Sequence, residues 1–533
     1  MHFEARACQK SVYILIANLI FAAAAPASAE TLADAIALAY QTNPTLESAR
    51  YDLRAADEGL VQARSQLRTK AELNVTGAYN RRINGRVSQE VNPLRPRAIG
   101  SNSNIAQVVV SQPLFTGGRA TAARDAALAN IRVGREILRG TEGDLLLSVI
   151  TAYVDVRRYR AALLIWQSSV DQLQRLTKEI GARQVAGEVT RTDVAQAEAQ
   201  LSIARQQMVI TEQALEAARA DYATLVGHEP GKLSEVPDLP NLPYRVEVAF
   251  ALAEEQNPEI KHAIFSEHAS RASIVAAKAE GQPTLNLRAE AGLIGKALPY
   301  HFRNQDQNYT GSVVLTVPLS AGGAIASSIR EAEDRNGSDR FKIEATRRDV
   351  DRSVSRTWNH MISAAAQVDL QSQQRHFAEV QLDGMVNEYR VGLRSTFDVL
   401  FAQQQLRDAE VALLTSKCDH YLAEASLLRQ TGLLEARTLL TGVQLRDPES
   451  HLREIGGRNS LPWDGVISAL DEVTAPRFRQ QMLRPSGASD ANPSIKQTKG
   501  DIIQRTYSRS LPTTPIRESV EQPSAPASDN AHS

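Results

Sequence analysis

Hydrophobic residues recur every seven positions over two stretches of the chain, 205 residues apart. A seven-residue apolar repeat predicts long α-helices that pack as left-handed coiled coils. The helix expected from about Gly118 to Ala182 would be about 100 Å long at ~1.5 Å per residue, and no compact globule needs such a length. The repeat positions are Val149, Val156, Leu163, Val170, Val194, Leu201, Met208, Leu215 and Tyr222, and their copies Val354, Met361, Val368, Val399, Leu406, Leu413, His420 and Leu427.

Four shorter segments alternate between apolar and polar residues, with a period of two. Such segments of about ten residues are typical of strands in a membrane barrel, although an ordinary half-buried hairpin gives the same pattern. Natural membrane barrels begin at about eight strands, so four strands would have to be pooled between copies of the chain, or lie outside a membrane. The segments centre on Leu73 to Tyr79, Ile105 to Gln112, Leu285 to Leu293 and Tyr309 to Val317.

The chain is internally duplicated. Asn43-Pro44 recurs as Asn257-Pro258, and the Pro-Leu-x-x-Gly-Gly segment that ends at Gly118 recurs with its end at Gly323. Each half therefore has the predicted order helix, two strands, very long helix, turn and long helix. We expect a signal peptide at 1–29, a first repeat at 30–227, a linker at 228–245 in the equatorial region, a second repeat at 246–445 and a polar, mostly disordered tail at 446–533.

The N-terminus has the pattern of a secretory signal. Arg6 and Lys10 precede an apolar run, and Ala27-Ser28-Ala29 is a small-residue cleavage site that would leave Glu30 as the first mature residue. The run is shorter than the ~20 residues that a membrane-spanning helix needs. Cys418 would then be the single remaining cysteine, so the mature chain is expected to contain no intrachain disulfide.

Composition and motifs argue against an enzyme or a nucleic-acid-binding protein. The formal net charge is -1, which favours no electrostatic partner such as DNA. Neither Gly117-Gly118 nor Gly322-Gly323 continues into a nucleotide-binding motif, and the ten histidines have no metal-binding spacing. We therefore expect no catalytic residue, no metal and no cofactor.

Glycines mark the predicted changes of chain direction. Gly117, Gly118, Gly322 and Gly323 lie where a strand becomes a helix, and Gly187 and Gly392 lie where one long helix folds back into the next. Asp193 and Asp398 open the returning helices. An aspartate at this position is explained equally well by the positive end of the helix dipole and by a role in function.

These features together resemble the TolC family of outer-membrane export proteins, over about Glu30 to Leu440. The most specific stretches are the two strand-to-helix joints and the segment from Tyr389 to Leu400, which is similar to the family pattern Y-x-V-G-x-R-x-x-x-D-V-L. The resemblance implies a mainly α fold with a small β part. A homotrimer would build a twelve-stranded barrel in outer-membrane lipid, and its long coiled-coil helices would form a periplasmic α-barrel.

The resemblance also implies partners and a gate. A periplasmic adaptor (membrane fusion) protein and an inner-membrane transporter, either ABC or proton-driven, would engage the helix tips. Tyr389 and Arg394 would hold the tips closed by contacts with Thr192 and Asp193, and Asp398 would contribute to an acidic ring in the lumen. The family pattern has a second acid one turn later, where this chain has Phe401, so cation binding by the ring is in doubt.

The predicted function is an outer-membrane duct that carries cargo from an inner-membrane transporter to the outside, with type I protein secretion favoured. The absence of a lipid-anchor cysteine and the tip segment favour secretion over the alternative, a multidrug efflux duct. A structural coiled-coil envelope protein would not need the paired amphipathic strands. A passive porin would not need the long heptad helices.

Overall fold

The structure is a computed structural model, and it describes residues 29–82, 99–296, 303, 305–440, 445–458 and 462–473. The expected signal peptide and most of the expected tail lie outside these residues. Among the described residues, none of the helices combines the length and the hydropathy of a membrane-spanning helix.

The two halves of the chain have the same sequence of elements, which confirms the duplicated fold. Helices α4 and α8 have 67 residues each, and α5 and α9 have 36 residues each. The first half consists of α2 (Leu32–Thr42), α3 (Pro44–Ser65), β1 (Lys70–Arg82), β2 (Ile99–Phe115), α4 (Arg119–Val185) and α5 (Arg191–Val226). The second half consists of α6 (Val246–Gln256), α7 (Pro258–Ala279), β3 (Thr284–Gly295), β4 (Asp306–Thr316), α8 (Ala324–Arg390) and α9 (Thr396–Thr431).

Each Asn-Pro pair divides a short helix from a longer one, because proline disfavours the helical conformation at the residue before it. Asn43 ends α2 and begins α3, and its side-chain oxygen accepts the backbone N–H of Thr45 at 3.0 Å. Asn257 does the same for α7, accepting the N–H of Glu259 at 2.8 Å. The amide NH₂ groups donate to carbonyls at the ends of α5 and α9, at Leu225 and Gln430. Each asparagine therefore joins a short helix to the end of a long hairpin.

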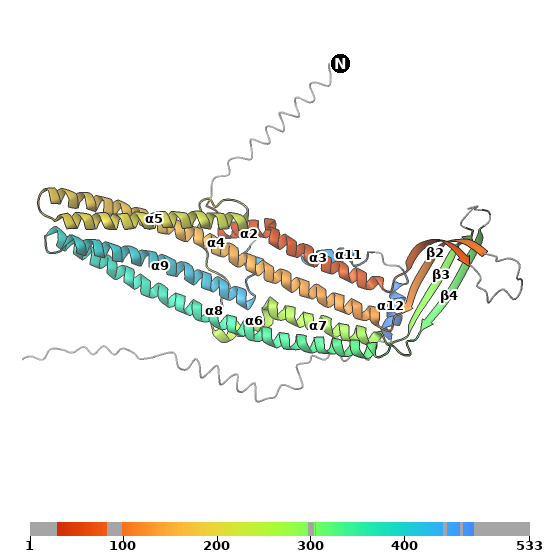
Figure 1. The fold of residues 1–533 in the computed structure, drawn as a ribbon. Coiled ribbons are helices and arrows are strands. Elements are labelled where there is room, and N and C mark those ends of the chain that lie inside the picture. The colour runs from red at the N-terminus through yellow and green to blue at the C-terminus, as the bar shows by residue number, and fades with distance from the viewer. Residues whose placement is uncertain are drawn as a thin grey trace, which may run out of the picture. The chain divides into compact units, whose positions relative to one another are not determined.

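The four strands form one antiparallel sheet in the order β1-β2-β3-β4. Lys70 pairs with Ser111, Val108 with Ala291, and Thr284 with Thr316. The sheet lies at one end of the long helices, and the turns α4–α5 and α8–α9 lie at the other (Figure 1). The apolar residues predicted to share one face of the outer strands are exposed in the single chain, namely Leu73, Val75, Tyr79, Tyr309, Val313 and Leu315.

The main core lies where α2 crosses the middle of α4, next to the ends of α5 and α9. Tyr153 and Tyr222 are its largest fully buried side chains. Most heptad positions of the first half are buried, including Val149, Val156 and Leu215, which confirms the predicted coiled-coil packing of α4 on α5. Helix α8 packs on α9 in the same way, but Phe341, Leu370 and Phe377 of α8 remain exposed.

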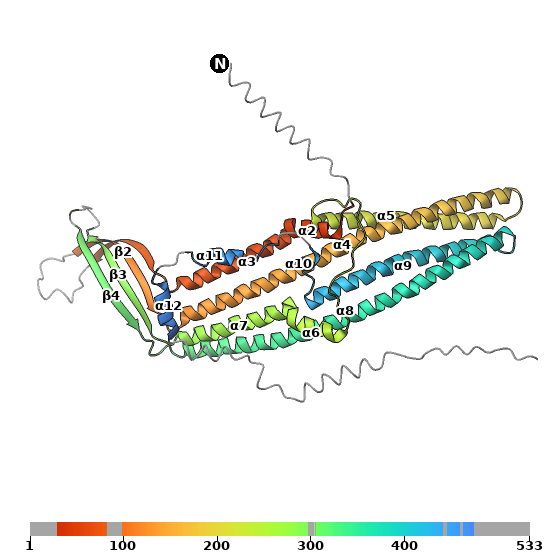
Figure 2. The same ribbon diagram turned by 180° about the vertical axis from the view of Figure 1, so that it is seen from behind.

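The chain after the second repeat returns along the first one. After α10 (Ala436–Leu439) come α11 (Ser450–Ile455), which packs on α3, and α12 (Asp464–Val473), which contacts β2 and α4 (Figure 2). We call residues 445–458 and 462–473 the C-terminal brace. The expected polar tail therefore begins with two packed helices. The expectation of disorder for 474–533 concerns residues outside the described part.

Candidate functional site

The first part of the candidate site is the pair of turns that join the long helices. Gly187 and Gly392 have φ of 81° and 80°, a left-handed conformation that glycine adopts readily. After each glycine the backbone turns back onto the helix. The N–H of Glu188 donates to the carbonyl of Arg183, and that of Leu393 to the carbonyl of Glu388, both at 2.9 Å. The two tips therefore have the same backbone geometry.

Asp193 and Asp398 are capping residues in the single chain. Asp193 accepts the backbone N–H and the hydroxyl of Thr190, both at 2.8 Å, and its own N–H donates to that hydroxyl oxygen. Ser395 and Asp398 make the same reciprocal box, with distances of 3.0 and 2.8 Å. The backbone and hydroxyl hydrogen bonds from Ser395 lower the pKa of Asp398, so this carboxylate is charged at neutral pH. The helix-capping interpretation thus accounts for both aspartates.

Tyr389 and Arg394 have partners that the sequence analysis missed. Tyr389 is buried at the end of α8, and the guanidinium carbon of Arg183 lies 4.9 Å from its ring centre, so this contact joins the two tips. Arg394 Nε donates to Glu388 at 2.6 Å within its own tip, and Arg183 pairs with Glu188 at 2.9 Å. The duplicated register was a signal for these partners, because Arg183 aligns with Glu388 at the offset of 205.

The structure does not bring the four predicted gate residues together within one chain. No hydrogen bond or ion pair between described residues joins Tyr389 or Arg394 to Thr192 or Asp193. Such links would have to form between copies of the chain, or in another arrangement of the tips.

An aromatic pair follows the cap of α9. The rings of Phe397 and Phe401 stack with their centres 6.2 Å apart and an interplanar angle of 17°. Phe397 is 52% exposed and Phe401 is 45% exposed, so two apolar rings lie at the surface next to Asp398. The departure from the family pattern at Phe401 therefore places an aromatic surface where the pattern has a second acid.

The strand-to-helix joints form the second part of the site, and their environments differ. All four joint glycines have positive φ, as the sharp change of direction requires. A Cβ atom on Gly117 would lie 2.5 Å from Cβ of Gln282, whereas a Cβ on Gly322 would meet nothing within 4 Å. The first joint is also closed by the C-terminal brace, because buried Asp471 accepts the backbone N–H of Thr116 at 2.8 Å.

The described residues have no arrangement that suggests metal chemistry. Across these ranges, no group of three or more His, Cys, Asp or Glu side chains is placed to hold a metal ion. The site can therefore be described by its packing, its charges and its hydrogen bonds.

Comparisons with known proteins connect this arrangement to a family. The model of the family described as outer membrane efflux protein matches residues 35–228 and 250–433. The chain is 28% identical to outer membrane efflux protein BepC of Brucella suis, over 84% of this chain and 96% of that protein. It is 24% identical to outer membrane protein TolC of Escherichia coli, over 91% of this chain and 99% of that protein.

Two further comparisons concern secretion and fold. The chain is 24% identical to alkaline protease secretion protein AprF of Pseudomonas aeruginosa, over 63% of this chain and 71% of that protein. A solved membrane protein from Pseudomonas aeruginosa has the same fold, with a TM-score of 0.66 at 20% identity, over 75% of this chain and 90% of that one. The two matched stretches of the family model fall in the two structural repeats.

Proposed function

The chain belongs to the outer membrane efflux protein family, whose members are channel proteins of the outer membrane, and from this premise we propose that it is the exit duct of a tripartite export system. Three copies of the chain form the duct, with twelve pooled strands in the outer membrane and the long helices in the periplasm. A periplasmic adaptor and an inner-membrane transporter deliver the cargo at the helix tips. The duct itself catalyses no reaction.

The observation that carries this proposal is the apolar surface that one chain leaves uncovered. Phe341, Leu370 and Phe377 lie exposed along one side of α8, and the outer strands expose a row of apolar residues. Exposed apolar residues that line up on one face commonly mark a surface that contacts another protein or a membrane. Copies of the chain would cover the helical surface, and lipid would cover the strands.

The tips are the proposed gate. We infer that Tyr389, Arg394, Thr192 and Asp193 act across tips in the trimer, where a small number of charged hydrogen bonds, each contributing about 1.5–3 kcal/mol, hold the resting state. Arg183 joins this set because it lies against Tyr389 within the chain. The Asp398 carboxylates face the lumen as a ring, bordered by the apolar pair Phe397 and Phe401.

The proposed cargo is protein, delivered by an ABC transporter. The likeness to AprF, which is named for alkaline protease secretion, supports this assignment together with the tip segment. The likeness to BepC, which is named an efflux protein, supports the alternative of a drug-efflux duct.

Two measurements test the proposal. Chemical cross-linking of the protein in mild detergent should give a trimer, and planar bilayers containing it should show discrete conductance steps; a monomer without conductance would contradict the duct.

Deleting the gene in the source organism should remove a protein from the culture medium, and the plasmid-borne gene should restore it. An unchanged set of secreted proteins with greater sensitivity to toxic small molecules would favour drug efflux.

A further inference from the structure

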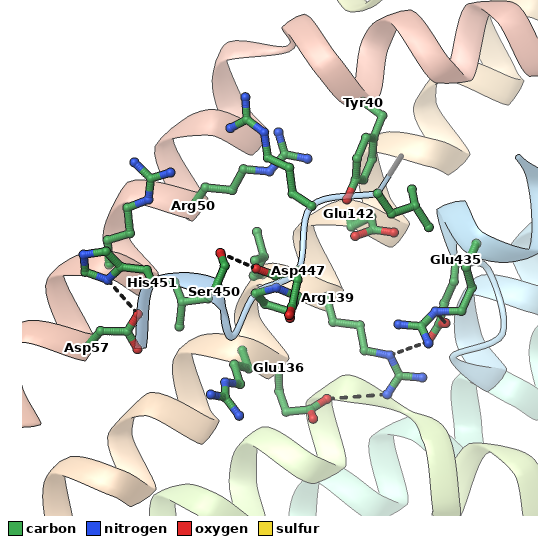
Figure 3. A pocket seen from close by; sticks show the side chains of 18 residues that line it. Tyr40, Arg50, Asp57, Glu136, Arg139, Glu142, Glu435, Asp447, Ser450 and His451 are labelled. Atoms are coloured by element: carbon green, nitrogen blue, oxygen red, sulfur yellow. Dashed lines mark hydrogen bonds and ion pairs between the residues drawn. The ribbon is translucent and has the colours of Figure 1, made fainter. Parts of the chain in front are cut away.

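A cavity of about 220 Å³ lies between α3, α4 and the C-terminal brace, away from the helix tips and the sheet. Figure 3 shows Arg50 and Asp57 on one wall, Glu136 and Arg139 on another, and Asp447, Ser450 and His451 of the brace closing the side between them. The cavity combines many charged groups with an apolar surface, so the balance between its donors and acceptors determines what it can hold.

Arg50 is the group that makes this cavity unusual. Its side chain is only 9% exposed, and its guanidinium lies 4.5 Å from the ring centre of Tyr40. Nη1 donates to Glu47 at 2.7 Å, but Nη2 is buried and has no acceptor among the described residues. A buried charged donor without an acceptor is costly, and proteins normally satisfy such groups with another group, water or a ligand.

Most carboxylates around the cavity have a partner, although Asp57 Oδ1 and Glu136 Oε2 are buried without a hydrogen-bond partner among the described residues. Glu47 also forms an ion pair with Arg446 at 2.9 Å. Asp57 pairs with Nδ1 of His451 at 3.0 Å, and Glu435 pairs with Arg139 at 2.7 Å. Glu142 accepts the backbone N–H of Ala436 at 3.0 Å. Six arginines and five carboxylates of the described residues line the cavity, so the cationic donors, including the unpaired Nη2 of Arg50, exceed the acidic groups.

A second donor lies on the facing helix. Arg135 binds Glu449 of the brace through Nη1 at 2.8 Å, while its buried Nε has no acceptor among the described residues. Leucine side chains of α3, α4 and the brace line the remaining surface, namely Leu53, Leu138 and Leu445. The cavity therefore offers cationic donors beside an apolar wall, together with carboxylate oxygens of Asp57 and Glu136 that accept no hydrogen bond from the described part of the chain.

The cavity is not a by-product of the duplication. At the offset of 214, Arg50 and Arg54 correspond to Ile264 and His268 of α7. On α8, the copies of Glu136 and Arg139 are Phe341 and Glu344. The polar lining is thus specific to the first repeat, where the brace crosses it.

We propose that this cavity binds a small organic anion. Its carboxylate or phosphate head accepts from Arg50, and its apolar body lies against Leu53, Leu138 and Leu445. Because such a ligand would touch α3, α4 and the brace at once, it would hold the brace in place. This inference does not depend on the cargo of the duct.

Equilibrium dialysis of the full-length protein in detergent tests the site, with benzoate, phenyl phosphate, inorganic phosphate and benzyl alcohol as probes. Benzoate or phenyl phosphate, or both, should bind saturably at one site per chain, and the difference between them identifies the head group. Arg50→Gln should weaken this binding by about 10-fold or more, as expected for a lost charged hydrogen bond. Arg335→Gln on the exposed side of α8 is the matched control and should bind as wild type.

The Leu445→Trp variant tests the site even if Arg50→Gln fails to fold. Its larger side chain fills the apolar side of the cavity without removing a charge, so Leu445→Trp should also abolish binding. Absence of saturable binding by both aryl anions would overturn the proposal. So would equal binding by Arg50→Gln and wild type, or binding of benzyl alcohol as tight as that of benzoate. Tighter binding of inorganic phosphate than of both aryl anions would contradict the proposed contact between the ligand's apolar body and the leucine side chains.

Discussion

At the scale of single residues, the two tips use opposite charges at corresponding positions. Arg183 lies in the last turn of α4 and pairs with Glu188 of the following turn, whereas Glu388 lies in the last turn of α8 and pairs with Arg394. Each turn therefore carries an ion pair of its own, and Arg183 is also free to lie on the ring of Tyr389. Any link across tips must compete with these local pairs, so the resting state can yield to a docking partner.

The double variant Tyr389→Phe with Arg394→Ser should open the tips. It removes a hydroxyl and a guanidinium from the proposed gate, and a lost charged hydrogen bond of about 1.5–3 kcal/mol corresponds to about tenfold or more in the open population. Single-channel recording in planar bilayers should show higher mean conductance. Glu388→Gln, which removes only the local partner that competes for Arg394, is the control and should not raise the conductance above that of wild type. Unchanged conductance in the double variant would exclude these residues from the gate.

Glu142 should make stability depend on pH. Burial raises the pKa of this carboxyl above its ordinary value of 4.5, because the charged form is poorly solvated between α4 and α10. A raised folded-state pKa gives a stabilising contribution below pH 4.5 that is lost as pH rises through the folded-state pKa.

Glu142→Gln should therefore unfold like wild type in acid and resist urea better near neutral pH, by on the order of 1 kcal/mol. Unfolding midpoints measured by circular dichroism from about pH 4 to pH 8 check this prediction. Glu331→Gln, at an exposed ion pair of α8, should show no such trend. A constant difference between Glu142→Gln and wild type at every pH would contradict it.

At the scale of elements, the same joint is built twice with different neighbours. The first joint is packed against the turn after α7 and bonded to Asp471, whereas Gly322 is open in the single chain. Sequence alone assigns the same role to both glycine pairs, because both stand between an apolar strand and a long helix. The structure shows that the two joints have different surroundings, because only the joint at Gly117 packs against another described part of the chain.

Gly117→Ala should be more damaging than Gly322→Ala. Both replacements put a Cβ on a left-handed residue, with φ of 67° and 58°, which costs about 1 kcal/mol. At Gly117 the new atom also meets Cβ of Gln282 at 2.5 Å, so overpacking of about 1–3 kcal/mol should be added. The urea midpoint of the detergent-solubilised protein measures both effects. Equal losses would mean that a second copy of the chain fills the space beside Gly322.

At the scale of the whole molecule, the C-terminal brace connects parts of the first repeat that are far apart in sequence. It binds α3 through His451 and Asp57, and it reaches the strand-to-helix joint through Asp471. Asp471 also accepts the hydroxyls of Thr116 and Thr121 at 3.0 and 3.1 Å. A carboxylate next to the N-terminus of α4 is favourable, because the first N–H groups of a helix carry partial positive charge.

Two truncated chains distinguish the contribution of α12 to stability from that of the residues after 475. A chain that ends after residue 475 should match the full-length protein, whereas one that ends after residue 458 loses α12 and leaves the buried donors of Thr116 and Thr121 without Asp471. Each buried donor left without an acceptor should lower the free energy of unfolding by about 1–3 kcal/mol. Resistance of the isolated protein to urea measures the loss, and Asp471→Asn should reproduce part of it. Helix α12 would have no stabilising role if both truncated chains unfolded like the full-length protein.

The sequence by itself determined every feature that neighbouring residues encode. The seven-residue apolar repeats determine the long helices, and the alternation of apolar and polar residues determines the strands. Asn43 and Asn257 mark where each short helix ends and the longer helix after it begins. Each of these patterns acts within one or two helical turns or strand pleats. The duplication then fixed the order of elements, because one offset related 67-residue helices in both halves.

Only the tertiary structure decided which polar groups meet. Nothing in the periodicity of residues 446–473 indicates that Asp471 caps a helix about 350 positions earlier, or that His451 reaches Asp57. The unpaired donor of Arg50 was hidden for the same reason, and the pairing of Arg394 with Glu388 was signalled only by the alignment of Arg183 with Glu388. Hydrogen bonds depend on distance and angle between two side chains, and sequence spacing specifies these only within a single element.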